Sequence, residues 1–249
     1  MPSVPDALIL CGGAGLRLRS VTGTAPKAMA DVAGRPFLEL LLRQLSRHGF
    51  RHTILAVGYQ KEMIRSRFRD RILGLSLEYS AETQPLGTGG ALRRAADLVQ
   101  TENLLVMNGD SYTDADLNRL VTVHRQAAAD VSIVVVPADG RIDCGSVLLD
   151  GNGSIGSFSE KAASCKTPFV NAGIYVMSRS LLYEIPPGVE VSLERELLPR
   201  WLQNGKTIKG FICSGRCTDI GTPERYRLAQ ELLASAETDT HEVGGEIRP

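Results

Sequence analysis

The sequence lacks an excess of charge of either sign. Lys and Arg together number 28 among its 249 residues, and Asp and Glu also number 28, so the formal net charge is zero. Proteins that bind DNA or RNA usually carry a basic surface that is attracted to the phosphate backbone. The balanced charge therefore argues against a nucleic acid as the partner.

Long apolar runs are also missing, and so is a basic, apolar leader. No segment contains the run of about 20 apolar residues that a membrane-spanning helix needs. The first six residues, MPSVPD, do not resemble a signal peptide. We therefore expect no membrane partner and a cytoplasmic location.

The chain has few cysteines, and their arrangement is irregular. The five cysteines are Cys11, Cys144, Cys165, Cys213 and Cys217, and none forms a C-x-x-C pair. An odd, scattered set predicts reduced thiols rather than a disulfide framework. The four histidines form no H-E-x-x-H motif, and no G-x-S-x-G motif is present. These absences argue against a zinc peptidase and an α/β-hydrolase.

What is present is enough apolar sequence for one large core, since 43% of the residues are hydrophobic. Strand-like and helix-like patterns alternate in the first half, which predicts βαβ units and a mostly parallel, Rossmann-like sheet flanked by helices. The expected strands are 7–10, 53–57, 75–79, 104–107 and 131–136. The expected helices between them are 37–48, 61–69, 89–99 and 117–128.

The second half changes character. Short strands are expected at 146–149, 155–158 and 170–177, with a hairpin turn at Asp150-Gly151-Asn152-Gly153. We interpret them as an antiparallel lobe added to the sheet, followed by helices at 193–202 and 224–234. The sequence thus predicts one domain over residues 1–236, with halves of about 1–136 and 137–236, and a flexible tail at 237–249.

The most informative stretch runs from Leu8 to Lys27. An apolar strand ends at Gly12-Gly13-Ala14-Gly15, and Arg17 and Lys27 follow. Glycines let backbone N–H groups approach an anion closely, and the two cations can neutralise phosphates. Neither G-x-G-x-x-G nor G-x-x-x-x-G-K-[ST] fits this segment. The pattern predicts a nucleoside triphosphate site, whereas the alternative is an ordinary glycine-rich turn.

Two carboxylates are candidate ligands for Mg²⁺. Asp110, in Asn108-Gly109-Asp110, directly follows an apolar strand, where open α/β sheets bind ligands. Mg²⁺ prefers one or two carboxylates together with phosphate oxygens. The alternative is a turn aspartate that caps the next helix. Asp219 lies before a helix start at Thr222-Pro223 and is not needed as its cap, which leaves it free as a second ligand. The alternative is that Asp219 only forms a local turn.

Three further segments carry weaker signals. Gln84–Ala91 is a glycine-rich turn that opens a helix, and Glu82 before it could accept from guanine N1–H and N2–H₂. Taken alone, Glu82 is better explained as an exposed loop charge. Glu160 could accept from sugar hydroxyls and Lys161 could hold a sugar phosphate, while Asn171 could contact the sugar ring.

Together these motifs resemble those of the sugar-1-phosphate nucleotidylyltransferases. Over about residues 6–233, the segments LRLRSV, PKAMADVAGRPFLELLL, PLGTGGA, NGDS, EK, NAGIYV and DIGTPERY are most similar to D-glycero-α-D-manno-heptose 1-phosphate guanylyltransferases. The resemblance implies a GT-A-like nucleotidyltransferase fold, nucleotide binding by the first half and sugar-phosphate binding by the second. It implies transfer of a nucleotide from an NTP, with GTP expected, to a sugar 1-phosphate.

The resemblance also implies roles for individual residues. Catalysis would rest on Arg17, Lys27, Asp110 and Lys161, and Asp110 and Asp219 would hold Mg²⁺. The nucleotide would contact Leu10, Gly12, Gly13, Gly15, Arg17, Glu82, Pro85, Gly87, Thr88, Asn108 and Gly109. The sugar phosphate would contact Gly145, Glu160, Lys161 and Asn171.

The sequence departs from the family at two positions. Leu16 stands where Thr or Ser is common, and Cys217 stands where an aromatic residue is common. Two alternative functions stay open. One is transfer to a hexose 1-phosphate from GTP, dTTP, UTP or CTP, and the other is a non-catalytic regulatory subunit that binds nucleotide sugars. Whether the chain forms a homo-oligomer is also left open.

Overall fold

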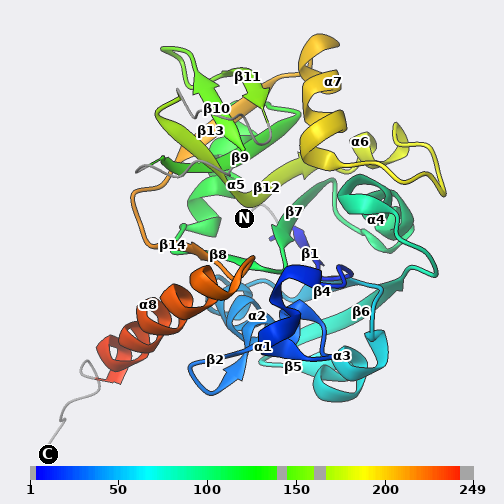
Figure 1. Ribbon diagram of the computed structural model, residues 1–249. Coiled ribbons are helices and arrows are strands. Elements are labelled where there is room, and N and C mark those ends of the chain that lie inside the picture. Colours follow the sequence, from blue (N-terminus) through cyan, green and yellow to red (C-terminus); the bar gives the residue numbers. More distant parts are fainter. Residues whose placement is uncertain (1–3, 139–144, 160–166, 242–249) are drawn as a thin grey trace, which may run out of the picture.

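The computed structural model describes residues 4–138, 145–159 and 167–241, and these residues form a ten-stranded sheet with helices on both faces (Figure 1). The strand order is β11-β10-β12-β7-β1-β4-β6-β5, with β9 and β13 continuing beside β12. The strands are β1 (Asp6–Leu10), β4 (His52–Val57), β5 (Arg71–Ile72), β6 (Leu75–Ala81), β7 (Asn103–Asn108), β9 (Val131–Pro137), β10 (Ser146–Leu149), β11 (Ile155–Ser159), β12 (Phe169–Ser178) and β13 (Ile208–Ile212).

Two small sheets and the helices complete the described fold. The small sheets pair β2 (Asp31–Val32) with β3 (Arg35–Pro36), and β8 (Ser111–Thr113) with β14 (Cys217–Asp219). The helices are α1 (Arg19–Thr22), α2 (Phe37–Arg47), α3 (Lys61–Phe68), α4 (Gly87–Ala95), α5 (Leu117–Gln126), α6 (Ser180–Tyr183), α7 (Leu198–Gln203) and α8 (Pro223–His241). Short 3₁₀ turns are η1 (Leu16–Leu18), η2 (Lys27–Met29) and η3 (Ala96–Leu98), and η4 (Leu193–Leu197) is a π-helical turn. None of the described helices combines the length and the apolar composition of a membrane span.

The parallel half of the sheet has the predicted order of strands and helices. Strand β1 lies between β4 and β7 and is parallel to both, with Leu8 in register with Ile54 and Val106. Side chains alternate along each strand, so each of these strands contributes apolar groups to both faces. Because helices cover both faces, all five residues predicted for the second strand are buried.

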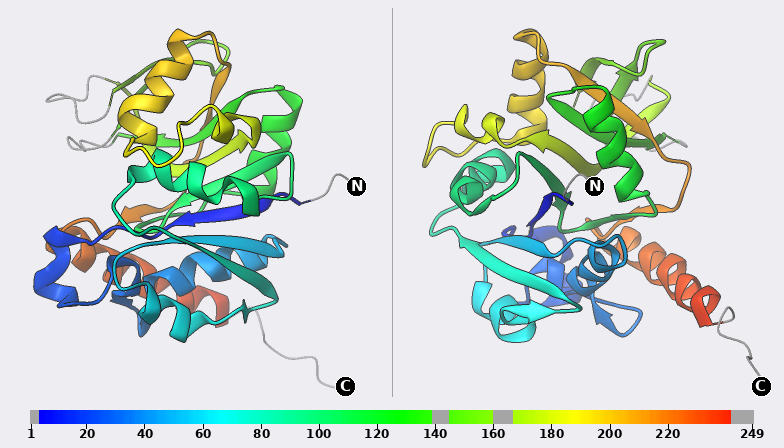
Figure 2. Two further views of the ribbon diagram at one scale, coloured as in Figure 1. Left: turned by 90° about the vertical axis from the view of Figure 1, so that its right-hand side faces the viewer. Right: turned by 180° about the vertical axis from the view of Figure 1, so that it is seen from behind.

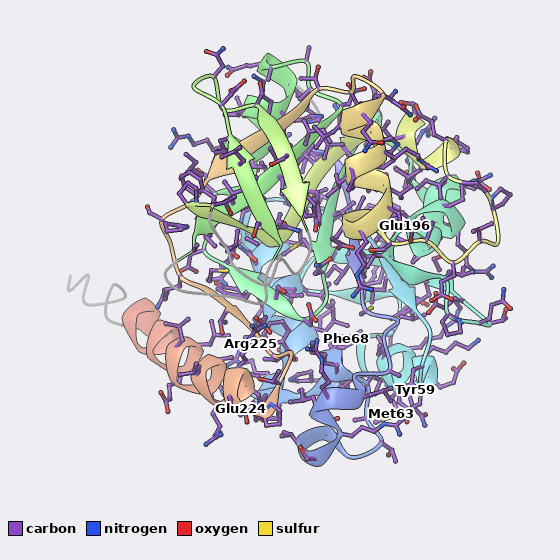
Figure 3. All side chains as sticks on the ribbon, turned by 45° about the horizontal axis from the view of Figure 1, so that its top comes forward. Tyr59, Met63, Phe68, Glu196, Glu224 and Arg225 are labelled. Atoms are coloured by element: carbon purple, nitrogen blue, oxygen red, sulfur yellow. The ribbon has the colours of Figure 1, made fainter. Side chains whose placement is uncertain are left out.

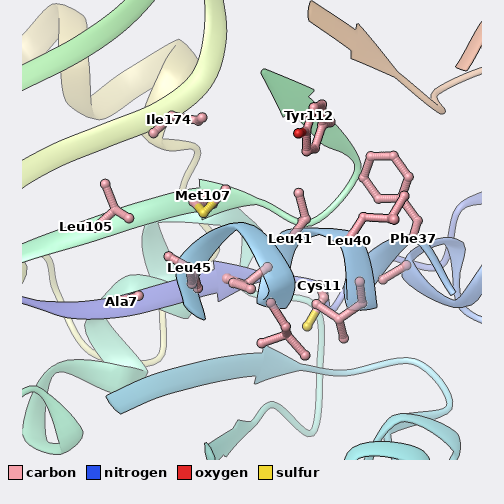
Figure 4. Packing of buried hydrophobic residues seen from close by; sticks show 14 of the residues in the cluster. Ala7, Cys11, Phe37, Leu40, Leu41, Leu45, Leu105, Met107, Tyr112 and Ile174 are labelled. Carbon is pink, nitrogen blue, oxygen red and sulfur yellow. The ribbon is translucent and has the colours of Figure 1, made fainter. Parts of the chain in front are cut away.

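The helices form two layers with a separate core on each face of the sheet (Figure 2). Ala7 and Ile9 of β1 belong to the core under α2, α3 and α8, and Leu8 belongs to the core under α4, α6 and α7. Figure 4 shows Leu41 and Leu45 of α2 beside Met107 of β7. These layers leave the carboxyl ends of the parallel strands free of covering helices.

The antiparallel lobe is confirmed, and β12 joins it to the parallel half. Strand β12 pairs antiparallel with β7 on one side and with β9 on the other, and its first residues also pair with β10. The predicted hairpin turn connects β10 to β11. The Asp150 carboxylate accepts from the N–H groups of Asn152 and Ser154, at 2.8 Å each, which fixes the turn.

Several boundaries differ from the expectations for physical reasons. The helix expected at 89–99 ends at Ala95 and continues only as a 3₁₀ turn, and the helix expected at 193–202 begins as the π-helical turn η4. Strands of two or three residues, such as β8 and β14, are too short to show an apolar period. Helix α8 continues to His241, so residues 237–241, assigned to the flexible tail, are helical.

One buried histidine ties α5 to the sheet. The His124 imidazole is 2% exposed and lies 3.0 Å from Ser132 Oγ and 3.2 Å from Asn103 Oδ1. Burial, with a smaller contribution from the nearby Arg125, lowers the pKa of His124 to about 4, against the opposing effect of Asp130. The imidazole is therefore neutral in the folded protein at neutral pH.

We expect His124 to make the protein less stable in acid. In the unfolded chain a histidine takes up a proton near pH 6.5, whereas the folded protein resists protonation down to about pH 4. Falling pH therefore favours the unfolded state across this interval, by on the order of 3 kcal/mol at most. Denaturant unfolding of His124→Gln between pH 7 and 4 should show a flatter decline than the wild-type protein. His48→Gln, which removes a less buried imidazole, should decline as steeply as the wild type, and a wild-type slope in His124→Gln would contradict the account.

Candidate active site

A cavity of about 670 Å³ opens at the carboxyl ends of β1, β4, β6 and β7. Its lining contains most of the residues predicted to bind nucleotide, which are Leu10, Gly12, Gly13, Gly15, Glu82, Pro85, Gly87, Thr88, Asn108 and Gly109. Lys27 and Asp110 line it as well. Sequence reasoning missed several lining residues, among them Gly58, Tyr59, Ser80, Arg94 and Glu190.

The glycine turn after β1 is fixed to the neighbouring turn after β4. The carbonyl of Gly12 accepts from the N–H of Tyr59 at 3.1 Å. Gly15 has a φ of +59°, and a Cβ there would lie 2.7 Å from Lys27 Cβ. Only glycine meets both conditions at low cost, and its presence lets Lys27 pass directly beside the turn.

Arg17 occupies a different position from Lys27. It is exposed on η1 and does not line the cavity, and among the described residues it has no ion-pair partner. Leu16, which replaces the common hydroxyl residue, is 65% exposed beside it. The structure thus brings Lys27 into the cavity lining and leaves Arg17 exposed on η1, outside that lining.

Lys27 and Asp110 form an ion pair inside the cavity. Lys27 Nζ lies 2.5 Å from Asp110 Oδ2, and the two side chains are 13% and 38% exposed. Ser111 Oγ donates to the other carboxylate oxygen at 3.0 Å. The enclosing protein by itself raises the pKa of Asp110, but the charge and hydrogen bonds of Lys27 and Ser111 outweigh this and hold the pKa below its usual range. Asp110 is therefore ionised at neutral pH.

Asp219 is brought to the same place by the pairing of β14 with β8. The N–H of Ile220 donates to the backbone carbonyl of Asp110 at 3.0 Å. The Asp219 carboxylate accepts from Arg225 Nη1 at 3.0 Å, and Figure 3 shows Arg225 at the start of α8. A Cβ at Gly221 would lie 2.7 Å from Asp219 Oδ1 and 3.6 Å from Lys27 Nζ, so both groups border this glycine.

This donor set fits Mg²⁺ bound together with a nucleotide. Among the described residues, no group of three or more His, Cys, Asp or Glu side chains could hold a metal alone. Two carboxylates, Asp110 and Asp219, supply the hard oxygen ligands that Mg²⁺ accepts when phosphate oxygens supply others. In this structure each carboxylate is paired with an internal cation, Lys27 or Arg225.

Glu82 lies at the inner end of the cavity, where β6 ends. Its N–H donates to the carbonyl of Val57 at 2.9 Å, and its carboxylate accepts from the N–H of Leu86 at 3.3 Å. Burial raises the pKa of Glu82, and Glu190 raises it further, while the Leu86 N–H and Arg94 lower it. The structure thus places Glu82 in the cavity wall, whereas the sequence taken alone favoured an exposed loop charge.

Two glycines at the start of α4, Gly89 and Gly90, have a packing role. The N–H groups of Gly89 and Gly90 both point to the carbonyl of Val191, at 2.8 and 3.3 Å. A Cβ at Gly89 would lie 2.5 Å from Leu197 Cδ1, and one at Gly90 would lie 2.5 Å from the carbonyl of Val189. These glycines therefore allow residues 189–191 to pack directly against α4. Their N–H groups already donate to Val191, so they are not free to bind a base or ribose.

The sugar-phosphate side is described only in part. Glu160 and Lys161 lie outside the described residues. The N–H of Asn171 donates to the carbonyl of Gly145 at 2.8 Å, so these two predicted contacts are neighbours. A Cβ at Gly173 would lie 2.9 Å from Asn108 Nδ2, which brings this turn of β12 next to the nucleotide cavity.

The thiol of Cys11 also lines the cavity, but its chemistry excludes a nucleophilic role. Burial, with a smaller contribution from Glu82, raises the pKa of Cys11 to about 12, although a backbone hydrogen bond opposes the shift. The thiolate is the reactive form of cysteine, and it is not populated at neutral pH with such a pKa. The cavity therefore offers charge neutralisation and positioning rather than a cysteine nucleophile.

Comparison with known proteins identifies the class to which this fold and cavity belong. The family described as nucleotidyl transferase matches residues 6–236, and the chain belongs to this family. It is 35% identical over 229 residues to D-glycero-α-D-manno-heptose 1-phosphate guanylyltransferase from Aneurinibacillus thermoaerophilus, covering 92% of this chain and 98% of that protein.

Two further relatives extend this comparison. Mannose-1-phosphate guanylyltransferase from Mycobacterium tuberculosis is 39% identical over 223 residues, and the match covers 89% of this chain but 62% of that longer protein. The crystal structure of HddC from Yersinia pseudotuberculosis, complexed with GMP-PN, superposes with a TM-score of 0.81 at 32% identity. That match covers 92% of this chain and all of HddC.

Gly58 gives a test of the cavity wall. A Cβ at this position would lie 2.5 Å from Glu82 Oε1 and 2.9 Å from the carbonyl of Gly12, so Gly58→Ala must displace both. We expect the dissociation constant for GTP, measured calorimetrically, to rise about tenfold, the loss of one good contact. Gly151→Ala, where a Cβ meets nothing within 4 Å, is the matched control. Equal GTP affinity in both variants would show that Glu82 and the glycine turn do not shape the nucleotide site.

Proposed function

We propose that this protein transfers GMP from GTP to D-glycero-α-D-manno-heptose 1-phosphate, giving the GDP-heptose and pyrophosphate. The observation that carries the proposal is the convergence of Lys27, Asp110 and Asp219 beside the glycine turn, at one end of a nucleotide-sized cavity. We infer the heptose from the similarity to the D-glycero-α-D-manno-heptose 1-phosphate guanylyltransferase of Aneurinibacillus thermoaerophilus, because the match covers 98% of that protein. We further propose that the product serves polysaccharide biosynthesis in the cytoplasm.

The reaction needs positioning and charge neutralisation more than proton transfer. A phosphate oxygen of the sugar 1-phosphate attacks the α-phosphorus of GTP, and the bond from that phosphorus to the pyrophosphate oxygen breaks. The attacking oxygen is already anionic, so no general base is required. Lys27 neutralises charge that develops around the α-phosphorus, and Arg17 is proposed to bind the outer phosphates. Lys161 is proposed to hold the sugar phosphate.

Asp110 and Asp219 would hold Mg²⁺ with the nucleotide. When bound there, Mg²⁺ supplies charge neutralisation for the phosphates and the leaving pyrophosphate. The protein's own part is to present Asp219 from β14 and Asp110 from the turn just before the paired strand β8, and to keep Asp110 ionised through Lys27. Neither carboxylate is required by the fold as a helix cap, which is consistent with this use.

Selection of guanine would fall to Glu82. An ionised carboxylate is acceptor-only and can receive both N1–H and an N2 hydrogen of guanine, a pair of donors that adenine lacks. Glu82 lies in the cavity wall with one carboxylate oxygen already accepting from Leu86. Guanine would therefore meet the oxygen that borders Gly12 and Gly58.

A substrate grid tests this proposal. We would measure pyrophosphate release with Mg²⁺ for GTP, ATP, CTP, UTP and dTTP, each with the 1-phosphates of mannose, glucose and D-glycero-α-D-manno-heptose. Turnover only with GTP and the heptose is the expected result. Turnover with another pair would keep the mechanism and replace the substrates, as in the hexose alternative. Nucleotide binding without any turnover would favour the non-catalytic regulatory subunit.

Asp110 and Lys27 provide the matching variants. We expect Asp110→Ala to lower kcat by about 100- to 1000-fold with an unchanged circular dichroism spectrum, because it removes an electrostatic contribution to the transition state. We expect Lys27→Ala to lower kcat far more than it raises KM for the sugar 1-phosphate. Asp97→Asn, an exposed carboxylate on η3 that accepts from Tyr183, is the control and should keep wild-type rates. Near-normal turnover in Asp110→Ala would refute the metal assignment.

A further inference from the structure

Glu194 is a buried carboxylate that none of the proposed steps uses. It lies on η4 and is 9% exposed. Its Oε2 accepts from Thr88 Oγ1 at 2.7 Å and from Ser192 Oγ at 3.2 Å, and its Oε1 accepts from the Tyr175 hydroxyl at 3.3 Å. The carboxylate therefore joins α4, at the nucleotide cavity, to β12 of the antiparallel lobe.

The chemistry of this contact is unusual for a buried charge. Among the described residues, no Lys or Arg forms an ion pair with Glu194. Buried carboxylates are usually paired with a cation, because burial without compensation is costly. Here three hydroxyl groups compensate the charge instead. This arrangement fixes the direction of each hydrogen bond, because a carboxylate can only accept and each hydroxyl must therefore donate to it.

On the side of the sheet, the direction of the hydrogen bond from Tyr175 to Glu194 also determines how the Asn171 amide is oriented. Because the Tyr175 hydroxyl donates its proton to Glu194, its oxygen is available to accept from Asn171 Nδ2, at 2.7 Å. Asn171 Oδ1 in turn accepts from the N–H of Gly173 at 2.9 Å. The amide of Asn171 thus has one orientation, and its second N–H hydrogen and a lone pair have no hydrogen-bond partner among residues 4–138, 145–159 and 167–241.

On the helix side, the same carboxylate orients Thr88. The Thr88 hydroxyl donates to Glu194 and accepts from the N–H of Leu193 at 2.8 Å. The segment before η4 is held on α4 as well, because the carbonyl of Val191 accepts from Gly89 and Gly90. Thr88 lines the nucleotide cavity. One rigid unit therefore reaches from the nucleotide cavity to Asn171.

We propose that Glu194 is a positioning residue that sets the orientation of Asn171 for the sugar 1-phosphate and of Thr88 for the nucleotide. This inference rests on the proposed function, in which Asn171 contacts the sugar phosphate. Glu194 acts through Tyr175 on one side and directly on Thr88 on the other. The π-helical turn that carries it is a form of helix often found at functional sites.

The substitution Glu194→Gln isolates this role. The glutamine amide has nearly the same shape but presents one acceptor oxygen and one donor NH₂ group. If the NH₂ group faces Tyr175, the hydroxyl proton loses its acceptor and the NH₂ competes with Asn171. If it faces Thr88, that hydroxyl loses its acceptor instead. Either orientation breaks one side of the unit.

The experiment is steady-state kinetics with both substrates varied, for the wild type and three variants. Tyr175→Phe should raise KM for the sugar 1-phosphate about tenfold and leave KM for GTP within twofold. Thr88→Val should show the reverse pattern. Glu194→Gln should raise at least one of the two KM values by at least fivefold. If the KM for the sugar 1-phosphate rises, adding Tyr175→Phe should raise it no further, and if the KM for GTP rises, adding Thr88→Val should raise that KM no further, because the paired changes break the same link.

Glu39→Gln is the matched control for a purely structural effect. Glu39 is also a buried carboxylate, 7% exposed, but it is paired with Arg43 and Arg67 on the α2 side of the sheet. Its loss should lower Tm while both KM values stay within twofold. If Glu194→Gln behaves in the same way, or if its effect on either KM multiplies with that of the paired change, the inference is overturned.

The outcomes separate this inference from the proposed function. Wild-type turnover with an unmoved sugar KM in Glu194→Gln and Tyr175→Phe would overturn the inference alone. No wild-type turnover with any sugar 1-phosphate would overturn the proposed function and the inference together. Should Glu194→Gln fail to fold, Tyr175→Phe decides the matter, because it removes a single hydroxyl and keeps the ring in the core.

Discussion

The ion pair between Lys27 and Asp110 is the contact on which the site depends. It joins the segment after the glycine turn to the end of β7, 83 residues further along the chain, at 2.5 Å. Gly15 makes the approach possible because no side chain separates the turn from Lys27. The backbone carbonyl of Asp110 accepts a hydrogen bond from the N–H of Ile220, and this contact brings the neighbouring Asp219 close to Asp110. The ion pair, the glycine turn and the pairing of β14 with β8 therefore bring Lys27, Asp110 and Asp219 together at one end of the site.

A second constraint holds the two halves of the domain together. The start of α4 is glycine-rich because the backbone of residues 189–191 packs directly against it, and the carbonyl of Val191 caps its first N–H groups. This contact places η4, and with it Glu194, between the nucleotide cavity and β12. These contacts connect the lobe that carries Asn171 to the wall of the nucleotide cavity.

Sequence reasoning predicted the parallel strands and the residues at their ends, because buried strands are continuous apolar runs and ligands bind where such strands end. It placed Lys27, Asp110 and Glu82 in or near one site, and the structure brings them to one cavity. It could not predict that Gly89 and Gly90 serve packing, since their partner, Val191, is about a hundred residues away. Glu194 carried no signal, because a glutamate in a helical pattern is ordinarily an exposed charge.

The metal site that we propose, in which Asp110 is completed by the phosphates of the bound nucleotide, can be tested directly. The direct measurement is a Mn²⁺ titration followed by electron paramagnetic resonance, with and without a non-hydrolysable GTP analogue, for the wild type and Asp110→Asn. The account predicts that the analogue tightens Mn²⁺ binding to the wild-type protein, because the phosphates supply the missing oxygen ligands, and that Asp110→Asn abolishes most of this gain. Equal Mn²⁺ binding by both proteins in the presence of the analogue would contradict it.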